Sequence, residues 1–371
     1  MAARALPDRS FFVLSIVGTR PEAIKMAPVV RSLGLRPAIR QRIFLTGQHA
    51  GLAAGFEGVP VDALSLDLRE HSPAELRETL THAACRYLAR ERPDLVVVQG
   101  DTTSALAGAL AARDCGVPIA HVEAGLRSHQ LEPWPEEDNR VAIDALADLL
   151  FAPTDAAAAN LAAERRVTGA VHVTGNSGID ALFHAGKGMV PILAPDGRKT
   201  ILVTCHRREN QGEPLNRICD ALKRLVAEFP VRVLFLLHPN RHLREAVAAK
   251  LGGLDHIALT EAVGHERMVR LMRQSWILLT DSGGLQEEGT TLGLPVLVTR
   301  EVTERIEAGA NIELVGTDPV RIVAAVNRLL MDEVHYARMA HPALPFGDGH
   351  AGPRIAALIE DWLAGKAAKR A

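Results

Sequence analysis

Short apolar runs alternate with helix-like segments along the whole chain, and this alternation restricts its fold more than any other feature. Amphipathic stretches such as Pro214–Phe229 separate the runs, and a polar or glycine-containing turn follows each of them. The runs that read as buried strands are Phe12–Val17, Ile43–Leu45, Leu95–Val98, Pro118–Val122, Leu149–Ala152, Val171–Val173, Ile201–Val203, Val231–Leu237, His256–Leu259, Trp276–Leu279 and Val296–Val298. Strands that alternate with helices predict an α/β fold with parallel sheets and right-handed crossovers.

The chain is long enough for two domains. Its 371 residues exceed what one ordinary hydrophobic core organises. Glycines and prolines interrupt the periodicity between Gly175 and Lys199, just before a new strand begins. We therefore expect two Rossmann-like domains, over residues 1–176 and 177–353. A final amphipathic helix is expected over about residues 354–371; it can pack on either domain, and our division returns it to the first.

Composition and charge exclude several classes of protein. Hydrophobic residues make up 47% and aromatic residues only 4%, which is typical of parallel sheets covered by helices. The formal net charge is -2 without a basic block, so we expect neither nucleic acid nor an anionic membrane as a partner. The four cysteines are widely spaced, which indicates neither a disulfide framework nor a zinc site. The run Phe11–Val17 is too short for a signal segment, and no run is long enough to span a membrane, so we expect a cytoplasmic protein.

A glycine pair follows the strand Trp276–Leu279. Ser282, Gly283 and Gly284 stand where a strand passes into a helix, and backbone N–H groups at such a turn can cradle a phosphate. Glu288 comes one helical turn later, where a carboxylate can accept hydrogen bonds from ribose hydroxyls. The alternative interpretation is an ordinary loop glycine pair followed by a solvated acidic helix face.

Acidic residues follow three turns of the first half. Asp101 comes after the strand Leu95–Val98, and Glu123 directly follows the strand Pro118–Val122. Glu136 begins a helix after a proline turn. Carboxyl groups gathered near one cleft raise one another's pKa and can act as acid and base at neutral pH. The alternative for Asp101 is a helix cap.

Cations follow other strand ends. Arg20 and Lys25 lie after the first strand, where they can face a phosphate or remain ordinary solvated surface residues. In the second half His206 follows the strand Ile201–Val203, and a histidine there is structural as often as catalytic. Arg305 is placed to hold a phosphate or an acid of the neighbouring domain.

Six motifs in order resemble the non-hydrolysing UDP-N-acetylglucosamine 2-epimerases. They are Gly18–Pro28, Gly100–Thr103, His121–Arg127, Trp134–Glu137, His206–Glu209 and Asp281–Glu288, and the likeness runs from about Val13 to Gly352. Thr102 after Asp101 argues against the hydrolysing relatives, in which an arginine is expected there.

The resemblance implies a GT-B arrangement of two Rossmann-like domains, with the active site in the interdomain cleft. It also implies a homodimer and a reaction that needs no metal or redox cofactor. That reaction interconverts UDP-GlcNAc and UDP-ManNAc by eliminating UDP to 2-acetamidoglucal and adding it back, and it supplies surface polysaccharide synthesis. By motif, Asp101, Glu123, Glu136 and His206 are the catalytic candidates. The substrate-binding candidates are Arg20, Lys25, Ser282, Gly283, Gly284, Glu288 and Arg305.

Some positions depart from the family pattern, and other functions stay open. The segment Ala262–Met268 lacks the aromatic residue that relatives usually place near Met268, beside the uracil. Cys205 occupies a position at which relatives usually have a small residue. The residues after Thr46–His49 also differ, which puts in doubt the activation by a second UDP-GlcNAc known in bacterial relatives. The alternatives are an epimerase of a modified UDP-HexNAc such as a diacetamido uronic acid, a GT-B glycosyltransferase, and a catalytically silent nucleotide-binding protein.

Overall fold

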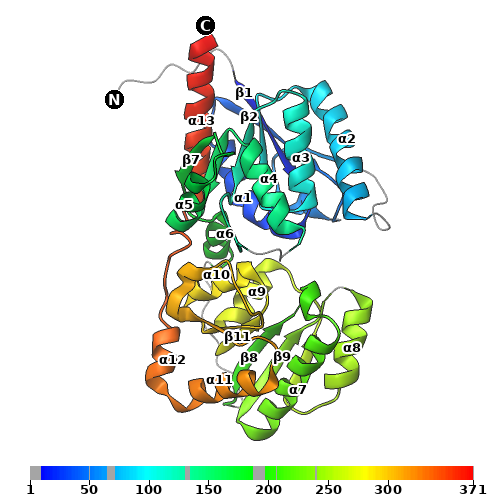
Figure 1. The fold of residues 1–371 in the computed structure, drawn as a ribbon, viewed down its shortest axis with the longest axis vertical. Helices are drawn as coiled ribbons and strands as arrows, with labels where there is room; N and C mark the ends of the chain where they lie inside the picture. The colour runs from blue at the N-terminus through cyan, green and yellow to red at the C-terminus, as the bar shows by residue number, and fades with distance from the viewer. Residues whose placement is uncertain are drawn as a thin grey trace. The chain divides into compact units, whose positions relative to one another are not determined.

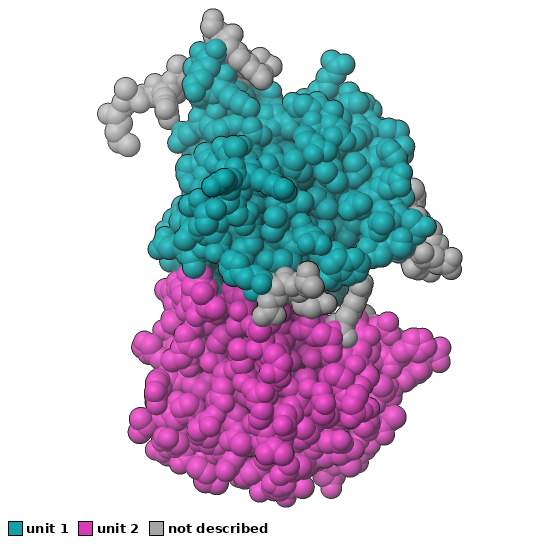
Figure 2. Space-filling view, in the orientation of Figure 1, with its two compact units in different colours: residues 1–181, 346–371 teal, residues 182–345 magenta. Residues whose placement is uncertain are grey.

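The chain forms two compact units. The computed structural model describes residues 10–49, 51–64, 72–129, 134–186, 197–205, 207–238 and 240–370. One unit comprises Met1–Ala181 and Phe346–Ala371, and the other comprises Leu182–Pro345 (Figure 2). The division falls a few residues after the boundary at 176 that we expected from the sequence, and the chain returns to the first unit at Phe346 rather than at 354.

The first unit is a parallel sheet with helices on both faces (Figure 1). Its strands, in the spatial order β3-β2-β1-β4-β5-β6-β7, are β1 (Phe11–Val17), β2 (Ile39–Leu45), β3 (Val61–Ala63), β4 (Leu95–Gln99), β5 (Ile119–Val122), β6 (Leu149–Ala152) and β7 (Ala170–Val173). The helices are α1 (Arg20–Gly34), η1 (Leu52–Gly55), α2 (Pro73–Glu91), α3 (Thr103–Asp114), α4 (Glu136–Leu146), α5 (Asp155–Ala163), α6 (Ser177–Ala185), which crosses the division, and α13 (Ala351–Arg370).

Alternate residues of the central strand β1 feed two hydrophobic cores. Val13 and Val17 pack on the face covered by α1 and α13, whereas Leu14 and Ile16 pack on the face covered by α2 and α3. Helix α13 contributes Ile355 and other buried residues to the first of these cores. The final helix is therefore part of the first unit.

The second unit repeats the same plan. Its parallel strands, in the order β10-β9-β8-β11-β12-β13, are β8 (Lys199–Thr204), β9 (Val231–Leu236), β10 (Ile257–Thr260), β11 (Ile277–Thr280), β12 (Val296–Val298) and β13 (Ile312–Leu314). The helices are η2 (Arg208–Asn210), α7 (Glu213–Glu228), α8 (Arg241–Leu251), α9 (His265–Arg273), α10 (Gly283–Leu292), η3 (Ile306–Asn311), α11 (Pro319–Met331) and α12 (Glu333–Met339).

Every run that the sequence predicts as a strand overlaps a strand of the structure. The ends differ by at most two residues except in β2, which begins four residues before the predicted Ile43. Two short strands, β3 and β13, were not predicted. Each has three residues with an acid in the middle, Asp62 and Glu313, and each lies at the edge of its sheet. Edge strands are often short and polar, so their apolar pattern is weak. Among the described helices, none is long and apolar enough to cross a membrane.

The strand orders locate the ligand-binding edge of each sheet. In the first unit the chain winds outward in opposite directions from β1 and β4, and in the second from β8 and β11. Ligands of such sheets bind at the carboxyl ends of the strands where this reversal occurs. The turns after these four strands are therefore the places to look for a site.

Candidate functional site

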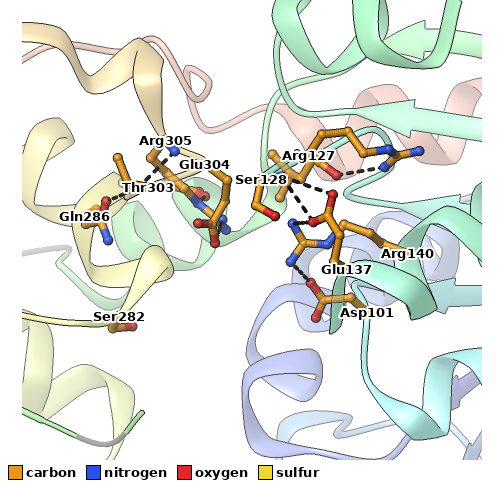
Figure 3. A network of polar contacts seen from close by, with 12 residues as sticks. Asp101, Arg127, Ser128, Glu137, Arg140, Ser282, Gln286, Thr303, Glu304 and Arg305 are labelled. Atoms are coloured by element: carbon orange, nitrogen blue, oxygen red, sulfur yellow. Dashed lines mark hydrogen bonds and ion pairs between the residues drawn. The ribbon is translucent and has the colours of Figure 1, made fainter. Parts of the chain in front are cut away.

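Asp101 lies directly after β4 and is held by the first turns of α4. Its Oδ2 accepts a hydrogen bond from Arg140 Nη2 at 2.5 Å (Figure 3). Its carbonyl oxygen accepts one from Asn139 Nδ2 at 2.8 Å. The cap of α3 is Thr102, whose hydroxyl accepts from the backbone N–H of Ala105. The capping alternative for Asp101 is therefore wrong, and its carboxylate is placed by an arginine instead.

Glu123 follows β5 in a left-handed conformation, with φ at 69°. Lys25 Nζ donates to its two carboxylate oxygens at 2.6 and 2.7 Å. Gln99 and Asn176 also donate to this buried carboxylate, Asn176 at 3.2 Å. Lys25 is thus a partner of Glu123 and not a solvated surface cation. A methyl group on Gly100 would lie 3.9 Å from Glu123 Oε2, so Glu123 lies close to the residue before Asp101.

Two of the three candidate acids of the first unit have a cation as their partner. Asp101 is paired with Arg140 and Glu123 with Lys25. Glu136 is half-buried as the first residue of α4. Arg20 is exposed at the start of α1. Cations therefore balance the two partnered acids, because they come from helices that begin at the same sheet edge.

A buried carboxylate that the sequence analysis overlooked joins two of these turns. Glu22 accepts hydrogen bonds from the backbone N–H groups of Gly18 and Thr19 at 2.9 and 2.5 Å, and from the hydroxyl of Thr102 at 2.6 Å. Burial raises the pKa of Glu22, although these hydrogen bonds act in the opposite direction. The capping-box spacing from Thr19 to Glu22 was the signal in the sequence that could have identified it.

A second buried network supports the turns after β4 and β5. His121 lies between the carbonyl oxygen of Gly100, 2.8 Å from Nε2, and Asp144 Oδ1, 2.6 Å from Nδ1. Asp144 also accepts from Arg127 at 2.8 Å and from the N–H of Gly125 at 3.1 Å. Burial acts to raise the pKa of Asp144, but His121 and Arg127 outweigh it and lower that pKa. The network anchors the residues on either side of Asp101 and Glu123.

The glycine turn of the second unit begins α10 as predicted. Ser282 is the N-cap, and its hydroxyl accepts a hydrogen bond from the N–H of Leu285. The two glycines have different surroundings. A methyl group on Gly283 would lie 2.9 Å from Arg305 Cζ, whereas one on Gly284 would meet nothing within 4 Å. The turn therefore rests on an arginine on one side and is open on the other.

Arg305 is buried beneath this turn and pairs with acids of its own unit. Its Nε donates to Glu287 Oε1 at 2.8 Å and its Nη1 to Glu304 Oε1 at 2.5 Å. Figure 3 shows Glu304 and Arg305 together, with Thr303 donating to Gln286 at 2.6 Å. Arg305 is thus partnered within its own unit, and its pairing with an acid of the other domain stays a prediction. Arg305 places positive charge under Gly283.

Glu288 is buried rather than solvated. Its Oε1 lies 3.0 Å from His265 Nε2, and its Oε2 is buried with no hydrogen-bond partner in the described part of the chain. Gln286 and Glu287 on the same helix are also buried. The interpretation of this segment as a solvated acidic face is therefore wrong. A buried carboxylate oxygen without a donor is costly, so a missing hydroxyl or amide donor is the simplest explanation.

A cavity of about 240 Å³ lies beside α9, the helix that carries His265. Its lining is mainly apolar but includes the imidazole of His238. The lining residues are Thr204, Cys205, Leu236, Leu237, His238, Ala262, Val263 and Met268. It occupies the carboxyl ends of β8, β9 and β10, and it has the size and polarity for a flat heterocycle. Burial and the nearby Asp281 raise the pKa of the Cys205 thiol well above its usual value.

His206 lies outside the described residues, so its predicted role is not tested here. Its neighbour Arg207 donates its backbone N–H to Asp281 Oδ2 at 2.9 Å, and Asn210 Nδ2 donates to the same oxygen at 2.9 Å. Asp281 therefore ties the turn after β8 to the start of α10. Within the described residues, no group of three or more His, Cys, Asp or Glu side chains is arranged to hold a metal ion.

Comparison with known proteins gives consistent matches over nearly the whole chain. The protein-family profile described as UDP-N-acetylglucosamine 2-epimerase matches residues 31–360. UDP-N-acetylglucosamine 2-epimerase of Escherichia coli (strain K12) is 39% identical over 377 residues, which cover 94% of this chain and 98% of that protein. The enzyme of the same name from Bacillus subtilis (strain 168) is 40% identical, over 95% of this chain and 94% of that protein.

Solved structures agree with the sequence matches. A co-structure of S. aureus MnaA with UDP has a TM-score of 0.89 and 37% identity, covering 95% of this chain and 97% of that one. UDP-GlcNAc 2-epimerase from Neisseria meningitidis bound to UDP-GlcNAc has a TM-score of 0.87 and 34% identity, covering 95% of this chain and all of that one. These likenesses confirm the expected α/β fold class with two parallel, Rossmann-like sheets of the GT-B type.

Proposed function

Because the chain belongs to the UDP-N-acetylglucosamine 2-epimerase family, we propose that it interconverts UDP-GlcNAc and UDP-ManNAc by inverting C2. One structural observation supports this proposal independently of the family match. Helix α10 combines an open glycine turn at its N-terminus with a buried, partnerless carboxylate oxygen of Glu288 one turn later. A phosphate acceptor and a hydroxyl acceptor at this spacing are what a nucleoside diphosphate requires.

The second unit provides a consistent path for the nucleotide. We place the uracil in the apolar cavity beside Met268, the ribose at Glu288 and the diphosphate at the N–H groups of Gly283 and Gly284. Ser282 caps the same turn, and the guanidinium of Arg305 lies under it. The helix N-terminus and the arginine both favour the negative charge of the diphosphate.

The carboxylates of the first unit supply the proton transfers. The C2 proton is not next to a carbonyl group, so its direct removal is unfavourable. We propose elimination: a carboxylate takes the C2 proton, the C–H electrons form the C1=C2 bond, and the C1–O bond breaks as UDP leaves with its electron pair. Protonation of C2 on the opposite face and attack of UDP on C1 complete the inversion. Asp101, Glu123 and Glu136 are the candidate acids and bases, because two of them are fixed by cations at adjacent strand ends.

Charge that develops on the departing UDP requires cations and donors. Arg20 is exposed at the start of α1, so its guanidinium can reach phosphate or sugar oxygens. Lys25 enters the proposal as the cation paired with Glu123, where its charge acts next to the reacting sugar. His206 enters the proposal through its motif alone.

Exchange with solvent deuterium tests this proposal. The purified protein is incubated with UDP-GlcNAc in deuterated water, and products are followed by NMR and mass spectrometry. We expect UDP-ManNAc that carries deuterium at C2, and deuterium in the recovered UDP-GlcNAc, because the returning proton comes from an acid in exchange with solvent.

Other outcomes separate the alternative functions. Release of UDP only when a sugar or peptide acceptor is added would identify a glycosyltransferase. Exchange with a diacetamido uronic acid UDP-sugar but not with UDP-GlcNAc would identify the modified substrate. Binding of UDP without any exchange or transfer would overturn the catalytic proposal.

The assembly, compartment and biological use of the product remain proposals. The resemblance predicts a homodimer in the cytoplasm that supplies ManNAc-type precursors for surface polysaccharide. For the dimer, light scattering after size exclusion should give twice the chain mass of 39.9 kDa. A mass equal to one chain at micromolar concentration would contradict it.

A further inference from the structure

Helix α9 begins with a histidine that contacts the carboxylate assigned to the ribose. His265 is the first residue of the helix, after Gly264, which provides no side-chain cap. Its Nε2 lies 3.0 Å from Glu288 Oε1. The other oxygen of the same carboxylate is buried and has no hydrogen-bond partner among the described residues. One oxygen of Glu288 is therefore held by His265, and the other can accept a hydrogen bond from a ligand.

This contact differs from an ordinary surface ion pair. The two side chains are only 15% and 11% exposed. Burial acts to lower the pKa of His265, but the hydrogen bond and charge of Glu288, with a smaller effect of Glu266, outweigh it and raise that pKa. A protonated histidine is unfavourable at a helix N-terminus, so the carboxylate of Glu288 also offsets the helix dipole. Both partners are thus restrained by their contact.

We propose that His265 is a positioning residue, which orients Glu288 so that its free oxygen accepts the ribose hydroxyls. The inference rests on the proposed binding of a UDP-sugar at this site. It assigns selectivity for a ribonucleotide to a pair of residues, one on α9 and one on α10.

The geometry explains why this position is effective. Rotation of the Glu288 side chain would exchange its two oxygens, and a donor fixed on Oε1 opposes that rotation. His265 and Met268 are three residues apart on α9 and lie on the same side of the helix. Met268 lines the apolar cavity, so one helix sets both the wall of the base cavity and the orientation of the ribose acceptor.

The test compares two nucleotides with three variants. Calorimetry gives Kd values for UDP and for 2′,3′-dideoxy-UDP with the wild-type protein, His265→Leu, His265→Gln and Glu288→Gln. We expect the wild type to prefer UDP by about tenfold or more, which is the scale of a hydrogen bond to a charged group. His265→Leu should lose most of this preference by weakening UDP alone. His265→Gln should retain it, because a glutamine amide can donate near the position of Nε2.

Additional measurements keep a folding defect separate from the proposed role. Thermal unfolding of each variant identifies any that is misfolded, and the double variant His265→Leu/Glu288→Gln should bind UDP no more weakly than Glu288→Gln alone. Equal weakening of both nucleotides by His265→Leu would overturn the inference, as would a wild type that binds both equally. A wild type that binds neither nucleotide would instead reject the proposed function.

Discussion

At the scale of single residues, two of the candidate catalytic acids, Glu123 and Asp101, are each partnered by a cation. Lys25 donates to both oxygens of Glu123, and Arg140 donates to Asp101. Buried ion pairs are weak sources of stability, because desolvation offsets most of their attraction. Their geometry orients the acids, however, and that is what a proton transfer at a sugar carbon requires.

Replacing Asp101 by asparagine tests the acid directly. The amide keeps the shape of the side chain but cannot take or return a proton, so we expect turnover to fall by about a hundredfold or more. UDP affinity should change little, because the nucleotide residues lie in the other unit. Steady-state epimerisation and calorimetry measure the two quantities.

A matched control comes from the same region. Asp138 is an exposed acid in the first turn of α4, to which no role is assigned. Asp138→Asn should retain wild-type turnover. Unchanged turnover in Asp101→Asn would remove Asp101 from the catalytic set.

The pH dependence of stability follows from the raised pKa of His265. The unfolded chain has a histidine pKa of about 6.5, and the folded protein binds this proton more tightly. The contribution to stability is therefore complete below about pH 6.5 and is lost as the pH rises through the higher pKa of the folded state.

Thermal unfolding midpoints of the wild type and His265→Gln measure this effect. The glutamine does not titrate, so subtraction of the two midpoints removes the contributions of other groups. We expect the advantage of the wild type to be larger at about pH 6 than at about pH 9. A difference that is constant or grows with pH would contradict the raised pKa.

At the scale of elements, α10 is a helix whose polar residues point inward. Gln286, Glu287 and Glu288 are consecutive and buried, because Arg305, Thr303 and His265 of other segments supply their partners. Such a helix cannot be recognised by hydrophobic periodicity. Its beginning could be, because the N-cap serine and the glycines are local signals.

The two glycines of this helix should respond differently to the same substitution. Gly283→Ala places a methyl group against the guanidinium of Arg305, so we expect a lower unfolding midpoint. Gly284→Ala meets nothing within 4 Å and gains helix propensity, so stability should not fall. Its methyl group, however, faces the side proposed for the diphosphate.

Calorimetry with UDP completes this comparison. We expect Gly284→Ala to weaken UDP binding by about tenfold or more, since a phosphate in the turn needs close backbone approach. Wild-type affinity in Gly284→Ala would show that the diphosphate does not lie at this turn.

At the scale of the whole molecule, the chain leaves the first unit at Ala181 and returns to it at Phe346. Helix α13 then packs against α1 (Figure 1). Its Ile355 lies in the same hydrophobic core as residues of β1 and α1, near the start of the chain. The first unit is therefore completed only after the second has been synthesised.

Truncation of Ile355 tests how much this return contributes. Ile355 is fully buried, so Ile355→Ala should lower the free energy of unfolding by about 2–5 kcal/mol through lost burial and a cavity. Denaturant titration measures it, with the exposed Asp361→Ala on the same helix as the control. Equal stability of both variants would mean that α13 is dispensable to the core.

Local pattern in the sequence was sufficient for much of this protein. Apolar runs and turn residues predicted the central strands, the glycine turn and the helices around them, because these signals depend on neighbours within one or two turns. The family motifs supplied the acids and the nucleotide residues. The edge strands β3 and β13 were missed because three residues with a central acid carry too little periodicity.

The tertiary structure alone decided which side chains meet. Lys25 and Glu123 are 98 residues apart, Asp101 and Arg140 are 39 apart, and His265 and Glu288 are 23 apart. No spacing rule joins such positions, since the parallel strand order determines which turns share an edge of the sheet. The residue types for the chemistry could therefore be predicted from the sequence, whereas their partners, burial and free oxygens depend on how the strands are arranged.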